Sequence, residues 1–100
     1  KVKGGSLSKG DVYKEINRHM GKIRMCYERE LMNDPKLAGK ITFDWTVKTN
    51  GSVSGVREKS SSLGSSKVSS CIRGVIQKMK FPKPKGGEVQ ISYPFIFSAG

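Results

Sequence analysis

A chain of 100 residues is long enough for one domain, and its 35% of hydrophobic residues can form only a small core. Its 19 basic and 8 acidic residues give a net charge of +11, which favours anionic partners such as nucleic acid, anionic lipid, acidic peptide or peptidoglycan. No apolar run approaches the roughly 20 residues that a membrane-spanning helix needs. The chain starts at Lys1 without a signal peptide, so we expect a fragment of a longer protein whose residues 1–7 end a Lys/Gly/Ser-rich linker.

The first expected element is an amphipathic helix over residues 11–32. Apolar residues recur at helical spacing: Val12, Ile16, Met20, Ile23, Tyr27 and Leu31. Ser8 followed by Asp11 is a weak form of the capping box that begins a helix. Asn33, Asp34 and Pro35 end the pattern.

Two strands joined by a tight turn are expected next. After Gly39, apolar residues alternate with polar ones at Ile41, Phe43, Trp45 and Val47, as in a half-buried strand. Asn50-Gly51 is a strong signal for a hairpin turn. The returning strand covers residues 52–59, and a change of frame around Gly55 indicates a bulge.

A second helix and a final strand complete the pattern. Ser65 or Ser66 is placed to cap the helix, and its apolar stripe is Val68, Cys71, Ile72, Val75, Ile76 and Met79. Pro82 stops the helix. Strict alternation over residues 89–97 then predicts a long strand, in which Pro94 cannot donate to a ladder and favours a position at the edge of the sheet.

These elements predict an α+β domain over residues 8–98, in the order helix, strand, strand, helix, strand. It has two layers: a three-stranded antiparallel sheet with both helices on one face. The other face of the sheet is expected to be partly open, because Thr42, Asp44 and Thr46 lie on it.

The two cysteines lie on the apolar sides of the two expected helices. If both helices pack on one face of the sheet, Cys26 and Cys71 can meet in a disulfide, which implies an oxidising compartment such as a bacterial periplasm. The alternative is a pair of unbonded, buried thiols, which behave as small apolar side chains.

The sequence gives little support for a metal, a cofactor or catalysis. His19 is the only histidine, and with Met20, Met25 and Cys26 it lacks any paired ligand spacing. The acidic pairs on the first helix, such as Asp11 and Glu15, are interpreted as a solvated, salt-bridged face. No triad or phosphate-binding glycine loop is recognisable, so we expect neither an enzyme nor a cofactor.

A basic run precedes the last strand, with lysines at Lys78, Lys80, Lys83 and Lys85. These lysines match a generic electrostatic footprint for nucleic acid. Lysines at a helix C-terminus also complement the helix dipole, and lysines beside an edge strand oppose aggregation. The signal is unspecific, and nucleic acid is not the expected partner.

The ordered set of motifs over residues 7–98 resembles the C-terminal domain of TonB-type energy transducers. The helix ending in Lys-Met-Lys-Phe-Pro-Lys-Pro at 78–84, the two glycines and the long last strand fit this family, as does Thr-Asn-Gly-Ser-Val-Ser-Gly-Val at 49–56. Four further motifs and Cys71 resemble a subfamily that ends gliding-motility proteins (AgmX/PglI type) of myxobacteria and related deltaproteobacteria. The motifs are Leu-Ser-Lys-Gly at 7–10, Cys-Tyr-Glu-Arg-Glu-Leu at 26–31, Pro-Lys-Leu-Ala-Gly-Lys at 35–40 and Tyr-Pro-Phe-Ile-Phe at 93–97.

This resemblance implies a periplasmic domain on a long linker, tethered to an inner-membrane segment and driven by a proton-powered motor. Its partner would be an extended segment of an outer-membrane or periplasmic protein, added as a strand at the edge formed by Val89, Gln90, Ile91, Ser92 and Tyr93. Pro94 would limit the usable edge. Met79 stands where an aromatic residue is usual and the cysteine pair is extra, which favours motility over nutrient transport.

Two other hypotheses stay open. The basic run could bind peptidoglycan or anionic lipid at the envelope surface, in which case binding should weaken steeply with salt. A free strand edge could also pair with a second copy of the chain to form a homodimer.

Overall fold

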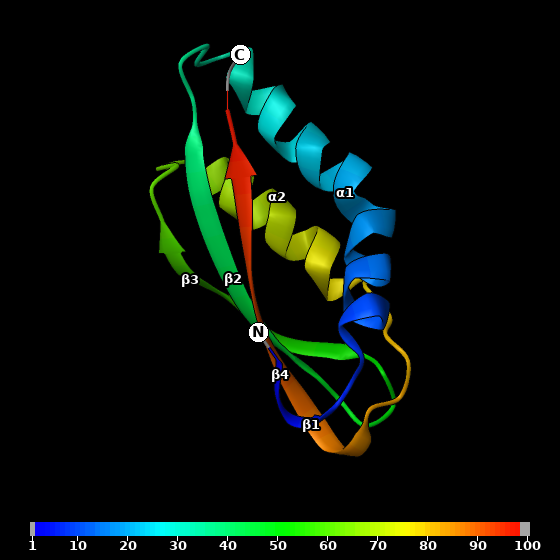
Figure 1. Ribbon diagram of the computed structural model, residues 1–100. Coiled ribbons are helices and arrows are strands. Elements are labelled where there is room, and N and C mark those ends of the chain that lie inside the picture. Colours follow the sequence, from blue (N-terminus) through cyan, green and yellow to red (C-terminus); the bar gives the residue numbers. More distant parts are fainter. Residues whose placement is uncertain (1, 99–100) are drawn as a thin grey trace.

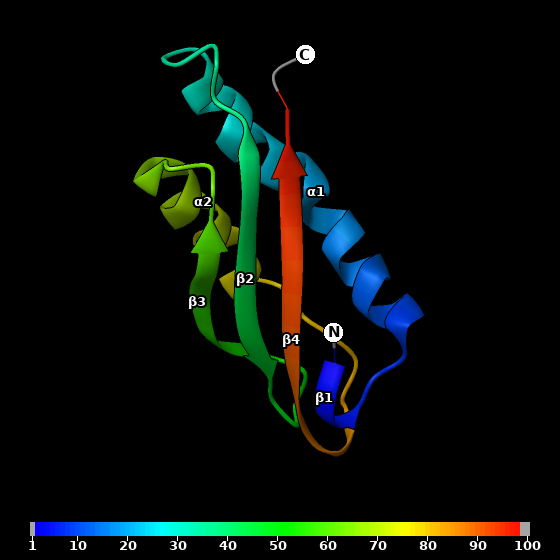
Figure 2. The ribbon, with the colours of Figure 1, turned by 60° about the vertical axis from the view of Figure 1, so that its left-hand side comes forward.

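Six elements form a sheet that is backed by two helices. The computed structural model describes residues 2–98, and the side chains of residues 5–98. The elements are β1 (Val2–Ser6), α1 (Lys9–Leu31), β2 (Gly39–Val47), β3 (Val53–Ser61), α2 (Ser66–Gln77) and β4 (Lys85–Phe97). Both helices lie on the same side of the sheet, α1 behind β4 and α2 behind β2 and β3 (Figures 1 and 2).

The sheet has four antiparallel strands in the order β1-β4-β2-β3, so the expected count of three is wrong by one. The fourth strand is β1, formed by residues that we predicted to be part of a linker. A glycine makes this pairing possible. A Cβ atom on Gly5 would lie 2.1 Å from the carbonyl oxygen of Gly87, so only a glycine allows the two backbones to approach this closely.

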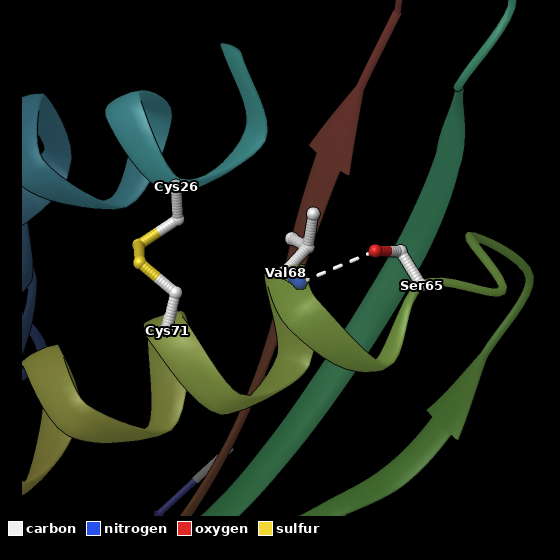
Figure 3. Close-up of a disulfide and its surroundings, with 4 residues drawn as sticks. All are labelled: Cys26, Ser65, Val68 and Cys71. Carbon is white, nitrogen blue, oxygen red and sulfur yellow. Dashed lines mark hydrogen bonds between the residues drawn. A yellow bond between two sulfur atoms is a disulfide. The ribbon is translucent and has the colours of Figure 1, made fainter. Parts of the chain in front are cut away.

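The helix caps form at the predicted serines. Ser8 precedes α1 and its Oγ accepts a hydrogen bond from the backbone N–H of Asp11 at 3.1 Å. Ser65 precedes α2 and accepts from the N–H of Val68 at 3.2 Å (Figure 3). Each bond satisfies a donor that the first helical turn leaves without an intrahelical partner. Both helices therefore begin where local sequence chemistry places them.

The core lies between the helices and the covered face of the sheet. Trp45 and Phe43 of β2 and Phe95 of β4 are its largest fully buried side chains. The alternate residues of β2, such as Thr42 and Thr46, are only partly buried, because no helix covers their face of the sheet. The expected division of β2 into an apolar and a polar face is confirmed.

A disulfide joins the two helices. Cys26 of α1 and Cys71 of α2 are bonded, with their Cα atoms 5.6 Å apart and 45 positions apart in the chain (Figure 3). This Cα separation is usual for a disulfide. Cys26 is buried in the core, whereas Cys71 is only partly covered. The bond closes the helix layer on the side away from the sheet.

The carboxylate of Glu15 corrects the expected solvated face of α1. Glu15 is buried, and its Oε2 accepts a hydrogen bond of 2.9 Å from the backbone N–H of Lys80. His19 Nε2 lies 2.9 Å from the same oxygen. Glu15 thus ties the first half of α1 to the chain that leaves α2, because a backbone donor there would otherwise lack a partner.

Gly51 gives the fold its most demanding turn, and we expect Gly51→Ala to lower the free energy of unfolding by about 2 kcal/mol or more. Its φ is +89°, and a Cβ there would lie 2.2 Å from the carbonyl oxygen of Phe81. The N–H of Phe81 donates to the carbonyl of Gly51 at 2.9 Å, so this contact would break as well. Urea unfolding followed by circular dichroism measures the change.

The matched control is Gly74→Ala, in the middle of α2. A Cβ at Gly74 meets nothing within 4 Å, so the change should be neutral or stabilise the helix by up to about 1 kcal/mol. Equal effects of the two alanines would contradict the packing of the β2–β3 turn against Phe81.

Candidate functional site

The candidate site is the outer edge of β4. On one side, β2 pairs with β4 over nine positions, from Val47↔Val89 to Gly39↔Phe97. On the other side, β1 pairs with β4 only as far as Val2↔Ile91. Within residues 2–98, no strand pairs with residues 93–97 on that second side. This stretch of β4 is an open edge, and Figure 2 shows it as the upper part of β4, above β1.

The predicted docking strand is therefore only partly open. Val89, Gln90 and Ile91 face Gly4, Lys3 and Val2 of β1, so the edge that we expected to be free there is already paired. Tyr93 lies past the end of β1. The sequence did not predict this pairing, because β1 is held to β4 by backbone hydrogen bonds and its sequence has no apolar face. Its residues show no alternation that would identify a strand.

Tyr93 is held at the edge by aromatic contacts. Its ring centroid is 5.0 Å from that of Phe95 on the same strand and 6.1 Å from that of Tyr13 on α1, the latter in an edge-to-face arrangement. Tyr93 therefore points toward the helix-covered face. Ile96, three positions further along β4, is 75% exposed. The open stretch of β4 thus has aromatic rings on its helix-covered face and the exposed side chain of Ile96 on the other face.

The opposite edge of the sheet, β3, is less suited to pairing. Its register with β2 shifts twice, between Thr42 and Phe43 and between Asp44 and Thr46. The second shift falls at the predicted bulge, where Gly55 has φ of +63°. Bulges bend an edge strand and increase its twist, which disfavours addition of a further strand. Of β3 and the open stretch of β4, the stretch of β4 is the better template.

The four lysines of the basic run are exposed, and they are spread along the connection between α2 and β4. Lys78, Lys80, Lys83 and Lys85 all face solvent, because Met79, Phe81 and Pro84 between them are buried. Lys78 ends α2 as its cap, and Lys85 begins β4 opposite Ser6. The four lysines thus follow a connection between two elements, and binding through them stays a prediction.

The remaining candidates from the sequence have structural contacts. Cys26 is in the disulfide and His19 contacts Glu15, so neither is combined with the two nearby methionines in a ligand set. Within the described part of the chain, no group of three or more potential metal ligands is assembled. No helix among residues 2–98 is long and apolar enough to cross a membrane.

Three contributors to this region were not predicted from the sequence. They are the strand β1, the buried carboxylate of Glu15 and the side chain of Tyr13, which stands off the apolar stripe of α1. The only sequence signal for Tyr13 is an aromatic residue directly after the apolar position Val12, at the border of the stripe.

Comparison with known structures defines the fold. The solution structure of the C-terminal domain of Helicobacter pylori TonB superposes with a TM-score of 0.51 over 96% of each chain, at 16% sequence identity. The chain therefore has an α+β fold of the TonB C-terminal domain type, as the motifs predicted. The identity is low, so this similarity establishes the fold and leaves the subfamily a prediction.

At the sequence level, no family model matches the chain. The tyrosine-protein kinase MasK of Myxococcus xanthus is 29% identical over 91 residues, which is 90% of this chain. The chain spans 14% of the length of that kinase. The similarity thus concerns a domain-sized part of a much longer myxobacterial protein.

Proposed function

We propose that this domain is a non-enzymatic adaptor that captures an extended segment of a partner protein by strand addition at the outer edge of β4. The observation that carries the proposal is the open stretch of β4 at residues 93–97, directly beyond the end of β1. Backbone groups of an unpaired edge are a ready template for another strand, and strand addition takes its affinity from main-chain hydrogen bonds.

The segment begins on residues 93–97 and extends over Val89, Gln90 and Ile91 by displacing β1. The four aligned positions of β1 make it a short strand, and short strands pair weakly. β1 then protects the edge when no partner is bound. The odd-numbered residues of β2 and β4 bond each other, so Pro94 removes a donor from the open side of β4 and limits how the two ladders join.

The cellular setting follows from three supporting features. The TonB-type fold and the helix-joining disulfide favour the periplasm, since disulfides persist in oxidising compartments. The motifs at 7–10, 26–31, 35–40 and 93–97 favour a role in gliding motility. In this proposal the domain is anchored to the inner membrane and passes force from a proton-driven motor to an outer-membrane or periplasmic protein. Energy transduction for outer-membrane transport is the alternative use of the same edge.

A second candidate function is binding of an anionic envelope surface, such as peptidoglycan or anionic lipid. The net charge of +11 and the exposed Lys78, Lys80, Lys83 and Lys85 favour it. Salt separates the two functions. Attraction to the lysines should weaken steeply between low and physiological salt, whereas strand addition should change little.

Photo-crosslinking in living cells tests the main proposal. A benzophenone amino acid at Ile96 of the full-length protein should give one dominant adduct with an extended segment of an envelope protein, because Ile96 projects from the open stretch of β4. The control position is Met32, which is 84% exposed at the end of α1 and lies in the helix layer, whereas Ile96 lies on the open face of the sheet. Equal adducts at both positions, or adducts only with a second copy of the chain, would contradict docking of a partner at β4.

A further inference from the structure

A hollow lies beside the open edge of β4, at the point where β1 ends. It has a volume of about 290 Å³, and α1 and β4 supply its walls: Lys9, Val12, Tyr13, Ile91, Ser92, Tyr93 and Pro94. In Figure 2 the N-terminal end of α1 lies above and to the right of β1, on the same side of β4 as β1. The hollow therefore opens next to the edge that a captured strand would occupy.

The direction of Tyr93 determines which residue of an added strand would reach the hollow. Tyr93 points to the helix-covered face, where its ring meets Tyr13. Side chains directly opposite each other in an antiparallel pair project to the same face, with Cβ atoms about 5 Å apart. The residue opposite Tyr93 would thus insert beside the two tyrosine rings.

The walls favour an apolar side chain. Val12 and Ile91 are 3% and 2% exposed and form the floor, whereas Tyr13 is 50% exposed at the rim. Aromatic rings such as those of Tyr13 and Tyr93 pack well against another aromatic or a branched aliphatic side chain. A side chain that fills the hollow would bury part of the exposed surface of Tyr13.

The charge at the rim favours an acidic neighbour. Lys9 is exposed at the first position of α1, and no acidic side chain lines the hollow. The chain as a whole carries a net charge of +11. A carboxylate next to the inserted side chain would therefore meet a cation and no competing acid.

We infer that this hollow is a specificity pocket, which takes one aromatic or branched aliphatic side chain from an acidic, extended segment of a partner protein. The inference rests on the proposed strand addition and adds the chemistry of the partner. Main-chain pairing to β4 supplies affinity for any extended peptide, and the pocket selects among peptides through one alternate side chain.

Binding of designed peptides to the purified chain tests this. Each fluorescent ten-residue peptide carries phenylalanine, leucine, alanine or lysine at its centre, flanked by glutamates or by lysines. Glutamate-flanked phenylalanine or leucine peptides should bind at least about tenfold more tightly than the alanine peptide, because the pocket buries their side chains. Fluorescence anisotropy at physiological salt gives the dissociation constants.

Two variants with matched controls locate the effect. Tyr13→Ser should reduce the preference for phenylalanine over alanine to less than about threefold, while Met25→Ser, at another exposed apolar residue of α1, should leave it unchanged. Lys9→Glu should reverse the preference for glutamate flanks, while Lys22→Glu should retain it. Thermal unfolding of each pair checks that the fold is intact.

The possible failures are distinguishable. Equal binding of all central residues, or an unchanged preference in Tyr13→Ser, would overturn the pocket. If the amide of Ile96 were still protected from hydrogen exchange by these peptides, strand addition would survive that result. A preference that follows Tyr13 and Lys9 without protection of β4 would uphold the pocket and remove strand addition.

Discussion

Replacing both Cys26 and Cys71 by alanine is expected to lower the free energy of unfolding by about 4 kcal/mol. The disulfide joins positions 45 residues apart, and the chain-entropy argument gives this value for a loop of that length. A small domain has a total stability of only about 5–15 kcal/mol, so the loss is a large part of it. The melting temperature should fall by at least about 15 °C.

Urea unfolding of the oxidised chain, the reduced chain and the double alanine variant measures the effect. The reduced chain and the variant should agree within about 1 kcal/mol, because both lack the same cross-link. Met25→Ala, at the exposed neighbour of Cys26, serves as the control and should cost less than about 0.5 kcal/mol. A loss below about 1 kcal/mol on reduction would show that the helix layer does not depend on the bond.

Gly5→Ala is expected to release β1 from β4 and to tighten binding of the captured segment by about tenfold. The new Cβ would lie 2.1 Å from the carbonyl oxygen of Gly87, a backbone atom that has no room to move without opening the pair. Because β1 occupies the edge that the segment extends over, releasing it removes the cost of displacing it. The amide of Gln90, which faces β1 and not β2, should exchange faster in the free variant, which reports loss of the pairing.

Gly10→Ala is the matched control, since a Cβ there has only Ser8 Oγ at 4.0 Å. It should leave both amide exchange and affinity as they are in the original chain. If Gly5→Ala released β1 without any gain in affinity, the segment would occupy only residues 93–97, and displacement of β1 would be wrong.

The elements that are specified locally could be predicted from the sequence. The apolar stripe of α1, the alternation of β2 and the turn at Asn50-Gly51 each depend on residues within a few positions of one another. Ser8 and Ser65 cap the helices for the same reason. The pairing of Cys26 with Cys71 followed from placing both helices on one face of the sheet.

The remaining features depend on contacts between distant residues. β1 has two glycines in five positions and no alternation, and it is a strand only because β4 lies beside it. Glu15 looked like a surface carboxylate, yet the backbone of Lys80, 65 positions away, donates to it. The strand β4 was thus predictable from its own alternation, whereas its pairing with β1 was not.

The most direct test of docking at β4 is amide hydrogen exchange of the domain bound to the segment captured at Ile96. Strand addition predicts that the amide of Ile96, whose N–H faces away from β2, gains protection by at least about tenfold, because this donor enters a new ladder. The amides of β3 (Val53–Ser61) should not change. Protection confined to β3 or to the lysine-rich connection at residues 78–85, with none on β4, would contradict docking at this edge.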